Sequence, residues 1–166
     1  DTDAAIIEFL KYYGDVILGK TTVLCKDTPA FIANRIGVFS IMSIFNIVDK
    51  QGLTIDEVEA LTGPIIGRPK SATFRTADVV GIDTLVKVAE GVKQNCPNDE
   101  ASHIFTIPEW LQKITANKWL GDKTGQGFFK KVKNDKSVSK ILTIDLKTLE
   151  YAPRIKPKFA ALEAAK

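Results

Sequence analysis

Cysteine and histidine are scarce in this sequence, and each shortage excludes a class of function. The two cysteines, Cys25 and Cys96, are too few for a disulfide framework and lack metal-site spacing, as expected for a protein of the reducing cytoplasm. The single histidine, His103, has no sequence neighbour that suggests a metal or nucleophile partner, so a surface or loop position is the favoured interpretation. No G-x-G-x-x-G turn occurs, so the chain contains no complete dinucleotide-binding unit.

A strong excess of one charge is also missing. Lysine and arginine number 23 against 20 aspartate and glutamate, which gives a net charge of +3. This balance is too mild to predict a nucleic-acid or membrane-surface partner. The apolar stretch 31–48 approaches the length of a membrane span, but Asn34, Arg35 and Asn46 interrupt it, so we expect a buried core helix.

The residues that are present predict one mainly helical domain. Hydrophobic content of 45% and charged content of 26% are ordinary for a globular protein. Apolar periodicity predicts an amphipathic helix over 4–18, a short strand over 21–25 and a long helix over 29–51. Further helices are expected over 54–62, 73–80, 84–94 and 109–120, followed by a β-hairpin of 140–145 with 148–151 and a linker over 153–158.

The most informative run is 26–35, which is typical of a strand leading into a helix. Asp27 or Thr28 can cap that helix, and Pro29 suits its first position. The helix is apolar on nearly every side, which predicts burial. Asn34 and Arg35 then lie in its first turns, where buried polar groups need partners. Asn34 is therefore the candidate site residue if an opening lies beside it, and a backbone-satisfied amide is the equally weighted alternative.

Two other polar groupings favour structure over chemistry. Asp78 and Asp83 flank Gly81 and are interpreted as caps or salt-bridge partners. A basic turn follows the phenylalanine pair 128–129, at Lys130, Lys131, Lys133 and Lys136. A phosphate contact is one interpretation of this turn, and a solvated loop is the favoured one.

Five blocks of residues occur together in an order that matches one known family. They are Gly19-Lys20 with Lys26-Asp27-x-Pro29-x-Phe31-Ile32-x-Asn34-Arg35, then Gly67-x-Pro69, Phe74, Asp78-Val79-Val80-Gly81-Ile82-Asp83 and Gly121-x-Lys123-Thr124-Gly125-x-Gly127-Phe128. In this respect the chain resembles the 3-hydroxyacyl-CoA dehydrogenases of fatty-acid β-oxidation. The resemblance covers about residues 15 to 130.

The resemblance implies a multi-helical dehydrogenase C-terminal domain, similar to that of 6-phosphogluconate dehydrogenase, with a short N-terminal strand and a C-terminal hairpin. It implies that 1–27 are the last helix and strand of an NAD-binding Rossmann domain, that 28–130 form the helical substrate and dimerisation domain, and that 131–166 are an extension. In the family the Rossmann domain binds NAD, and the helical domain covers the acyl-CoA site and forms much of a homodimer interface.

The family's active-site asparagine carries over onto Asn34, which is implied to hydrogen-bond the reacting oxygen region of the substrate and orient it. The family's catalytic histidine and its glutamate partner lie upstream of this block, where nothing in the chain matches, and His103 lies on the wrong side. The intact enzyme would oxidise a 3-hydroxyacyl-CoA to the 3-oxoacyl-CoA with NAD taking the hydride. We therefore expect this chain alone to be inactive.

The chain departs from the family in two places. Ser71-Ala72-Thr73 stands where many members have Gly-Pro, and the tail over 141–158 extends past the usual domain end. Both features resemble the branch fused to an enoyl-CoA hydratase. The chain begins at Asp1 with Met42 as its only methionine, so we expect a piece of a longer protein. Two alternatives stay open: a non-catalytic helical dimerisation or acyl-CoA-binding module, and another β-hydroxyacid or 6-phosphogluconate-type dehydrogenase.

Overall fold

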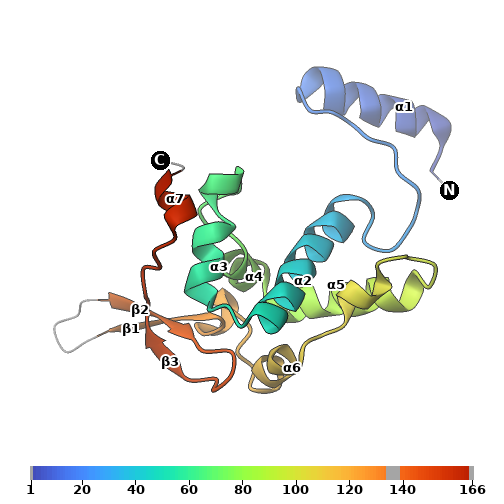
Figure 1. Ribbon diagram of the computed structural model, residues 1–166. Helices are drawn as coiled ribbons and strands as arrows, with labels where there is room; N and C mark the ends of the chain where they lie inside the picture. Colours follow the sequence, from blue (N-terminus) through green and yellow to red (C-terminus); the bar gives the residue numbers. More distant parts are fainter. Residues whose placement is uncertain (1, 134–138, 165–166) are drawn as a thin grey trace.

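Helices build most of the molecule, as the sequence predicts. The computed structural model describes residues 2–133 and 139–164. The helical body consists of α2 (Ala33–Gln51), α3 (Ile55–Leu61), α4 (Phe74–Val80), α5 (Ile82–Asn95) and α6 (Glu109–Ala116) (Figure 1). Three-ten turns lie at η2 (Pro64–Ile66), η3 (Ser102–Phe105) and η4 (Asp122–Thr124), and a short α7 (Ala160–Ala164) lies near the C-terminus.

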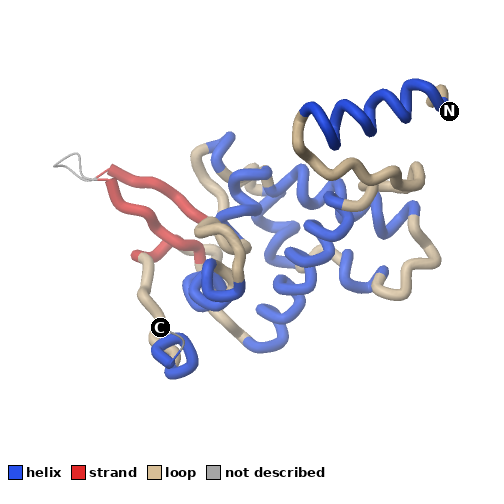
Figure 2. The backbone as a smooth tube through the Cα atoms, turned by 90° about the horizontal axis from the view of Figure 1, so that it is seen from above, coloured by secondary structure: helices blue, strands red, loops and turns tan. Residues whose placement is uncertain are grey.

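The N-terminal segment stands apart from this body in both views (Figures 1 and 2). It consists of α1 (Ala4–Tyr12), a π-helical turn η1 (Tyr13–Ile17) and an extended stretch. The predicted helix is confirmed, but α1 buries none of its residues, and Phe9 is 61% exposed. The strand predicted over 21–25 is wrong: these residues form no strand, because no described strand lies beside them to complete the ladder.

The helix α2 begins four residues later than predicted. Ala30 and Phe31 have left-handed backbones with φ of 65° and 49°, so regular helical geometry starts only after them. Pro29 therefore lies outside the helix, and no side chain caps its N-terminus. The expected end is confirmed, because Gly52 adopts φ of 65° and donates its N–H to Val48 O at 2.9 Å.

Only one face of α2 is buried, which corrects the prediction of burial all round. That face carries Val38, Met42, Phe45 and Val48. It packs against α5 and η3. On the other side Ile36 is 63% exposed and Ile47 is 50% exposed. Apolar residues surround the helix, but the described chain supplies packing partners for one side of it.

The centre of the core is a cluster of four aromatic rings. Its members are Phe45 on α2, Phe74 on α4, Trp110 on α6 and Phe128. Ring centroids lie 4.8 Å apart for Phe74 and Phe128 and 5.0 Å apart for Phe45 and Phe74. Trp110 Nε1 donates a 2.7 Å hydrogen bond to Asp49 Oδ1, which satisfies its one polar atom. The glycine-punctuated turn that carries Phe128 is thereby fixed to the helices.

A small antiparallel sheet follows this turn. Its strands are β1 (Phe129–Lys133), β2 (Ser139–Ile144) and β3 (Tyr151–Pro153), in the order β1-β2-β3. The predicted hairpin is present as β2 and β3, with Ile144 opposite Tyr151, but its second strand lies at Tyr151–Pro153 and not at the predicted 148–151. Strand β1 was not predicted, and it crosses the expected boundary between 130 and 131. Lys136 of the predicted basic turn lies outside the described residues.

Asp56 ties the C-terminal tail to the helical body. It lies at the start of α3, is 7% exposed, and accepts hydrogen bonds from Thr143 Oγ1 at 3.2 Å, Arg154 Nε at 3.0 Å and Ile155 N at 2.7 Å. The stretch interpreted as a linker is therefore anchored at its beginning. The same helix start carries the predicted capping box, in which Thr54 and Glu57 satisfy each other's backbone N–H groups.

Candidate functional site

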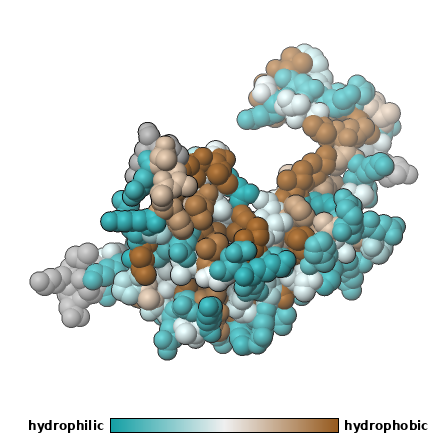
Figure 3. Space-filling model, in the orientation of Figure 1, coloured by the Kyte–Doolittle hydropathy of each residue, from teal (hydrophilic) through white to brown (hydrophobic). Residues whose placement is uncertain are grey.

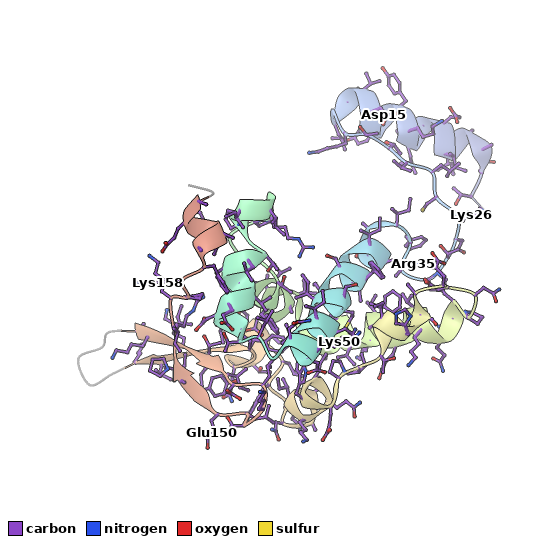
Figure 4. The ribbon with its side chains drawn as sticks, in the orientation of Figure 1. Asp15, Lys26, Arg35, Lys50, Glu150 and Lys158 are labelled. Atoms are coloured by element: carbon purple, nitrogen blue, oxygen red, sulfur yellow. The ribbon has the colours of Figure 1, made fainter. Side chains whose placement is uncertain are left out.

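Asn34, the candidate site residue, lies exposed in the first turn of α2. Its side chain makes no hydrogen bond to another residue in the described part of the chain. The neighbouring Arg35, labelled near the start of α2 in Figure 4, forms an ion pair with Asp99 in the segment after α5. This hydrogen bond from Arg35 holds the pKa of Asp99 below its ordinary value. The expectation that both polar groups are buried in the core is therefore wrong.

A shallow hollow lies beside this turn. Its volume is about 230 Å³, and it is lined by Arg35, Ile36, Phe39, Asp99, Glu100, Ala101 and Phe105. Asn34 precedes this set in sequence but does not line the hollow. The chain alone therefore does not enclose the amide beside an opening, and it holds no complete site around Asn34.

The surface around Asn34 is unusually apolar for a free face. Phe31 is 55% exposed, Ile32 is 45% exposed and Ile36 is 63% exposed. Figure 3 shows hydrophobic side chains at the surface both on the N-terminal segment and on the helical body that faces it. Apolar patches of this kind mark surfaces that another molecule or domain covers. Asn34 is a polar group within such a patch.

The two aspartates around Gly81 are structural, as predicted. Asp78 is 1% exposed, and its carboxylate accepts the N–H groups of Phe128 at 2.8 Å and Phe129 at 2.9 Å. Burial raises the pKa of Asp78 to about 6, although these two hydrogen bonds lower it. Asp83 instead forms an ion pair with Lys123, whose hydrogen bond lowers the pKa of Asp83.

The remaining candidates agree with the interpretations from sequence. His103 is exposed in η3. Cys25 and Cys96 are free thiols. Within residues 2–133 and 139–164, no group of three or more histidine, cysteine, aspartate or glutamate residues could hold a metal ion, and no helix is long and apolar enough to span a membrane.

The described residues do not fit a nicotinamide dinucleotide. Their strands are all antiparallel, and none leads through a glycine-rich turn into a helix. Such a turn is what places a pyrophosphate at a helix N-terminus. Nothing in the described part of the chain therefore offers that cradle.

A cavity of about 770 Å³, which no signal in the sequence predicted, lies beside the sheet. Its walls come from α3, the start of α4, η4, the strands β1 and β2 and the C-terminal tail. Of the described residues in the predicted basic turn, only Lys131 lines this cavity. Periodicity cannot bring together residues as far apart as Asp56 and Lys156.

Comparison with known proteins gives consistent matches. The family model described as 3-hydroxyacyl-CoA dehydrogenase, C-terminal domain, matches residues 31–131. A probable 3-hydroxyacyl-CoA dehydrogenase of Bacillus subtilis is 45% identical over 166 residues, which are 100% of this chain and 20% of that protein. A protein of the same name from Deinococcus radiodurans is 43% identical over 136 residues, 82% of this chain and 38% of that protein.

The fold has solved counterparts too. The crystal structure of Mycobacterium tuberculosis FadB2 matches with a TM-score of 0.65 and 25% identity, over 78% of this chain and 44% of that one. The chain thus spans between 20% and 44% of the length of these three matched proteins.

Proposed function

The chain belongs to the 3-hydroxyacyl-CoA dehydrogenase family, matching its C-terminal domain, and we propose that it forms the substrate-side half of an NAD-dependent dehydrogenase. The complete enzyme oxidises a 3-hydroxyacyl-CoA to the 3-oxoacyl-CoA during fatty-acid β-oxidation. NAD and the catalytic histidine and glutamate belong to an upstream Rossmann domain, to which residues 1–27 contribute the last helix and the extended stretch after it. The helical domain is 28–130, and 131–166 extend it with a sheet and tail that share its hydrophobic core, since β1 crosses the boundary at 130.

The observation that carries this proposal is the uncovered apolar face around Asn34. A hydrophobic surface of this kind is stable in water only when another body removes it from solvent. The N-terminal segment supports the same conclusion, because α1 has exposed apolar residues that none of the described residues bury. A cofactor domain that covers both surfaces would place Asn34 at the junction of the two halves. There the amide hydrogen-bonds the reacting oxygen region of the substrate and orients it.

The test is a chimera of the Bacillus subtilis relative in which this chain replaces the matching 166 residues. The chimera is expected to oxidise NADH with acetoacetyl-CoA, measured by the loss of absorbance at the NADH band. Asn34→Ala should lower kcat by about tenfold to a hundredfold, since one orienting hydrogen bond is worth about 1.4–2.7 kcal/mol in the transition state. The chain alone should show no turnover.

The matched control is Asn95→Ala, an exposed asparagine on α5 whose amide donates only to Gly91 O of its own helix. It should leave the rate of the chimera unchanged. Turnover by the isolated chain, or an Asn34→Ala chimera as fast as the parent, would contradict the proposal.

Exposed apolar surface toward the C-terminal end of α2, away from Asn34, also supports self-association, which the family resemblance implies as a homodimer. We expect the isolated chain to sediment as a dimer at micromolar concentration, because pairing buries apolar surface on α2 at roughly 25 cal/mol per Å². Ile47→Asp should shift the chain toward monomer. Ile141→Asp is the matched control, since Ile47 on α2 and Ile141 on β2 are each 50% exposed. A monomer in the parent chain would count against a dimer made by this chain alone.

A further inference from the structure

We propose that the cavity between α3, the sheet and the C-terminal tail binds an organic phosphate of the nucleotide class. Figure 1 shows the sheet and α3 on the other side of the body from the N-terminal segment, and Figure 2 shows the same for the sheet. The cavity shares no lining residue with the hollow beside Arg35. This site is therefore separate from the surface around Asn34, and the inference goes beyond the proposed dehydrogenase function.

Positive charge exceeds negative charge around the cavity. The basic lining residues are Lys70, Arg75, Lys131, Arg154 and Lys156, and the acidic ones are Asp56, Glu59 and Asp122. Each acidic group already has partners: Asp56 binds Arg154, Asp122 binds Arg75, and Glu59 accepts the backbone N–H groups of Thr73 and Arg75.

Three lysines are left to attract a ligand. Lys70 lies before α4, Lys131 lies on β1 and Lys156 lies in the tail, and all three are exposed. None of them forms an ion pair with a carboxylate in the part of the chain that the structure describes. Like charges converging on one concavity raise its positive potential and favour an anion, and lysine is a common point-charge partner of phosphate.

Lys130 and Lys131 are consecutive residues on β1, and their side chains lie on opposite faces of the sheet. Lys130 places its ammonium 5.5 Å from the centre of the Tyr151 ring, whereas Lys131 lines the cavity. Lys130, Lys131 and Lys133 therefore lie on a strand and not in a loop, and the exposed Lys131 is the one of them that lines the cavity.

One wall of the cavity is apolar, so the site favours a ligand that has an apolar or aromatic part as well as an anionic group. Phe129 lies in that wall, with the Arg154 guanidinium 5.1 Å from its ring centre. Ile141 and Ile155 line the same wall and are 50% and 71% exposed. The volume of about 770 Å³ is in the usual range for a small-molecule site. The ligand that fits has a phosphate for the lysines and an aromatic or apolar body for this wall.

The test is calorimetric titration of the chain with ADP, in parallel with adenosine and inorganic phosphate. ADP should bind with a dissociation constant below 1 mM, and adenosine and phosphate should each bind at least about tenfold more weakly, since each lacks one half of the recognition. Affinity for ADP should fall as salt rises from 50 to about 300 mM, because screening weakens exposed charge pairs.

Substitution then assigns the binding to this cavity. Lys70→Gln, Lys131→Gln and Lys156→Gln should each weaken ADP binding about threefold, and the triple variant about tenfold or more. Lys87→Gln is the matched control, an exposed lysine on α5 outside the cavity. Asn34→Ala should not change ADP binding, so failure here is distinguishable from failure of the dehydrogenase proposal. The inference is overturned if ADP does not bind at 1 mM, if adenosine or phosphate binds as well as ADP, or if the folded triple variant binds like the parent.

Discussion

Gly127→Ala is expected to lower the free energy of unfolding by about 4 kcal/mol or more, because the added methyl group has no space to occupy. A Cβ on Gly127 would lie 2.6 Å from Gly121 Cα and 2.8 Å from Gly121 N, and closer still to Asp78 Oδ1. Backbone on one side and a buried carboxylate on the other leave no flexible group that can move aside. Urea unfolding followed by circular dichroism measures the loss.

The matched control is Gly37→Ala, inside α2. A Cβ there meets nothing within 4 Å, so alanine should be neutral or stabilising by about 0.5–1 kcal/mol through its better helix propensity. Equal unfolding midpoints for Gly127→Ala and the parent would show that this turn can open, and that the close approach is not required.

Asp78→Ala is expected to cost about 3 kcal/mol. The substitution leaves the N–H groups of Phe128 and Phe129 buried without an acceptor, at about 1–3 kcal/mol each, and this is offset in part by the removal of a buried carboxylate. Asp83→Ala, which breaks the ion pair with Lys123, should cost less than about 1 kcal/mol. A loss at Asp78 no larger than at Asp83 would contradict the structural role assigned to this carboxyl.

The same group makes stability depend on pH. The pKa of Asp78 is raised from 3.8 to about 6 in the folded chain, so protonation favours the folded state. Its contribution is fully present below about pH 4 and is lost as the pH rises through 6, a change on the order of 3 kcal/mol. The stability of the parent relative to Asp78→Asn should therefore decrease between pH 4 and pH 7. A constant difference would show that burial does not govern this carboxyl.

Local signals in the sequence were sufficient for several elements. The capping box of Thr54 and Glu57 and the helix stop at Gly52 depend on residues within one turn, and both are confirmed. The mainly helical fold follows from the same periodicity. The start of α2 was wrong because the left-handed residues Ala30 and Phe31 displace it, and no nearby sequence signal announces them.

The remaining differences come from contacts between distant residues. Asp78 meets the backbone 50 residues away, and Asp56 meets Arg154 98 residues away, so neither partner could be read from spacing along the chain. The exposed position of Asn34 was missed for a different reason. An apolar helix has the same sequence pattern whether its own domain or a separate body covers it. Sequence alone could name Asn34 as a candidate but not the surface around it.

The anchoring of the tail at Asp56 determines how far the chain can be truncated from its C-terminal end without loss of stability. A cut after residue 130 would sever the first strand, strip Ile144 from the hydrophobic interior and leave the Asp56 carboxylate without the donors that Thr143, Arg154 and Ile155 supply. Any shortened or transplanted version must therefore extend at least to residue 155. The hairpin is part of the same folding unit as the helices and cannot be treated as an appendage to be trimmed.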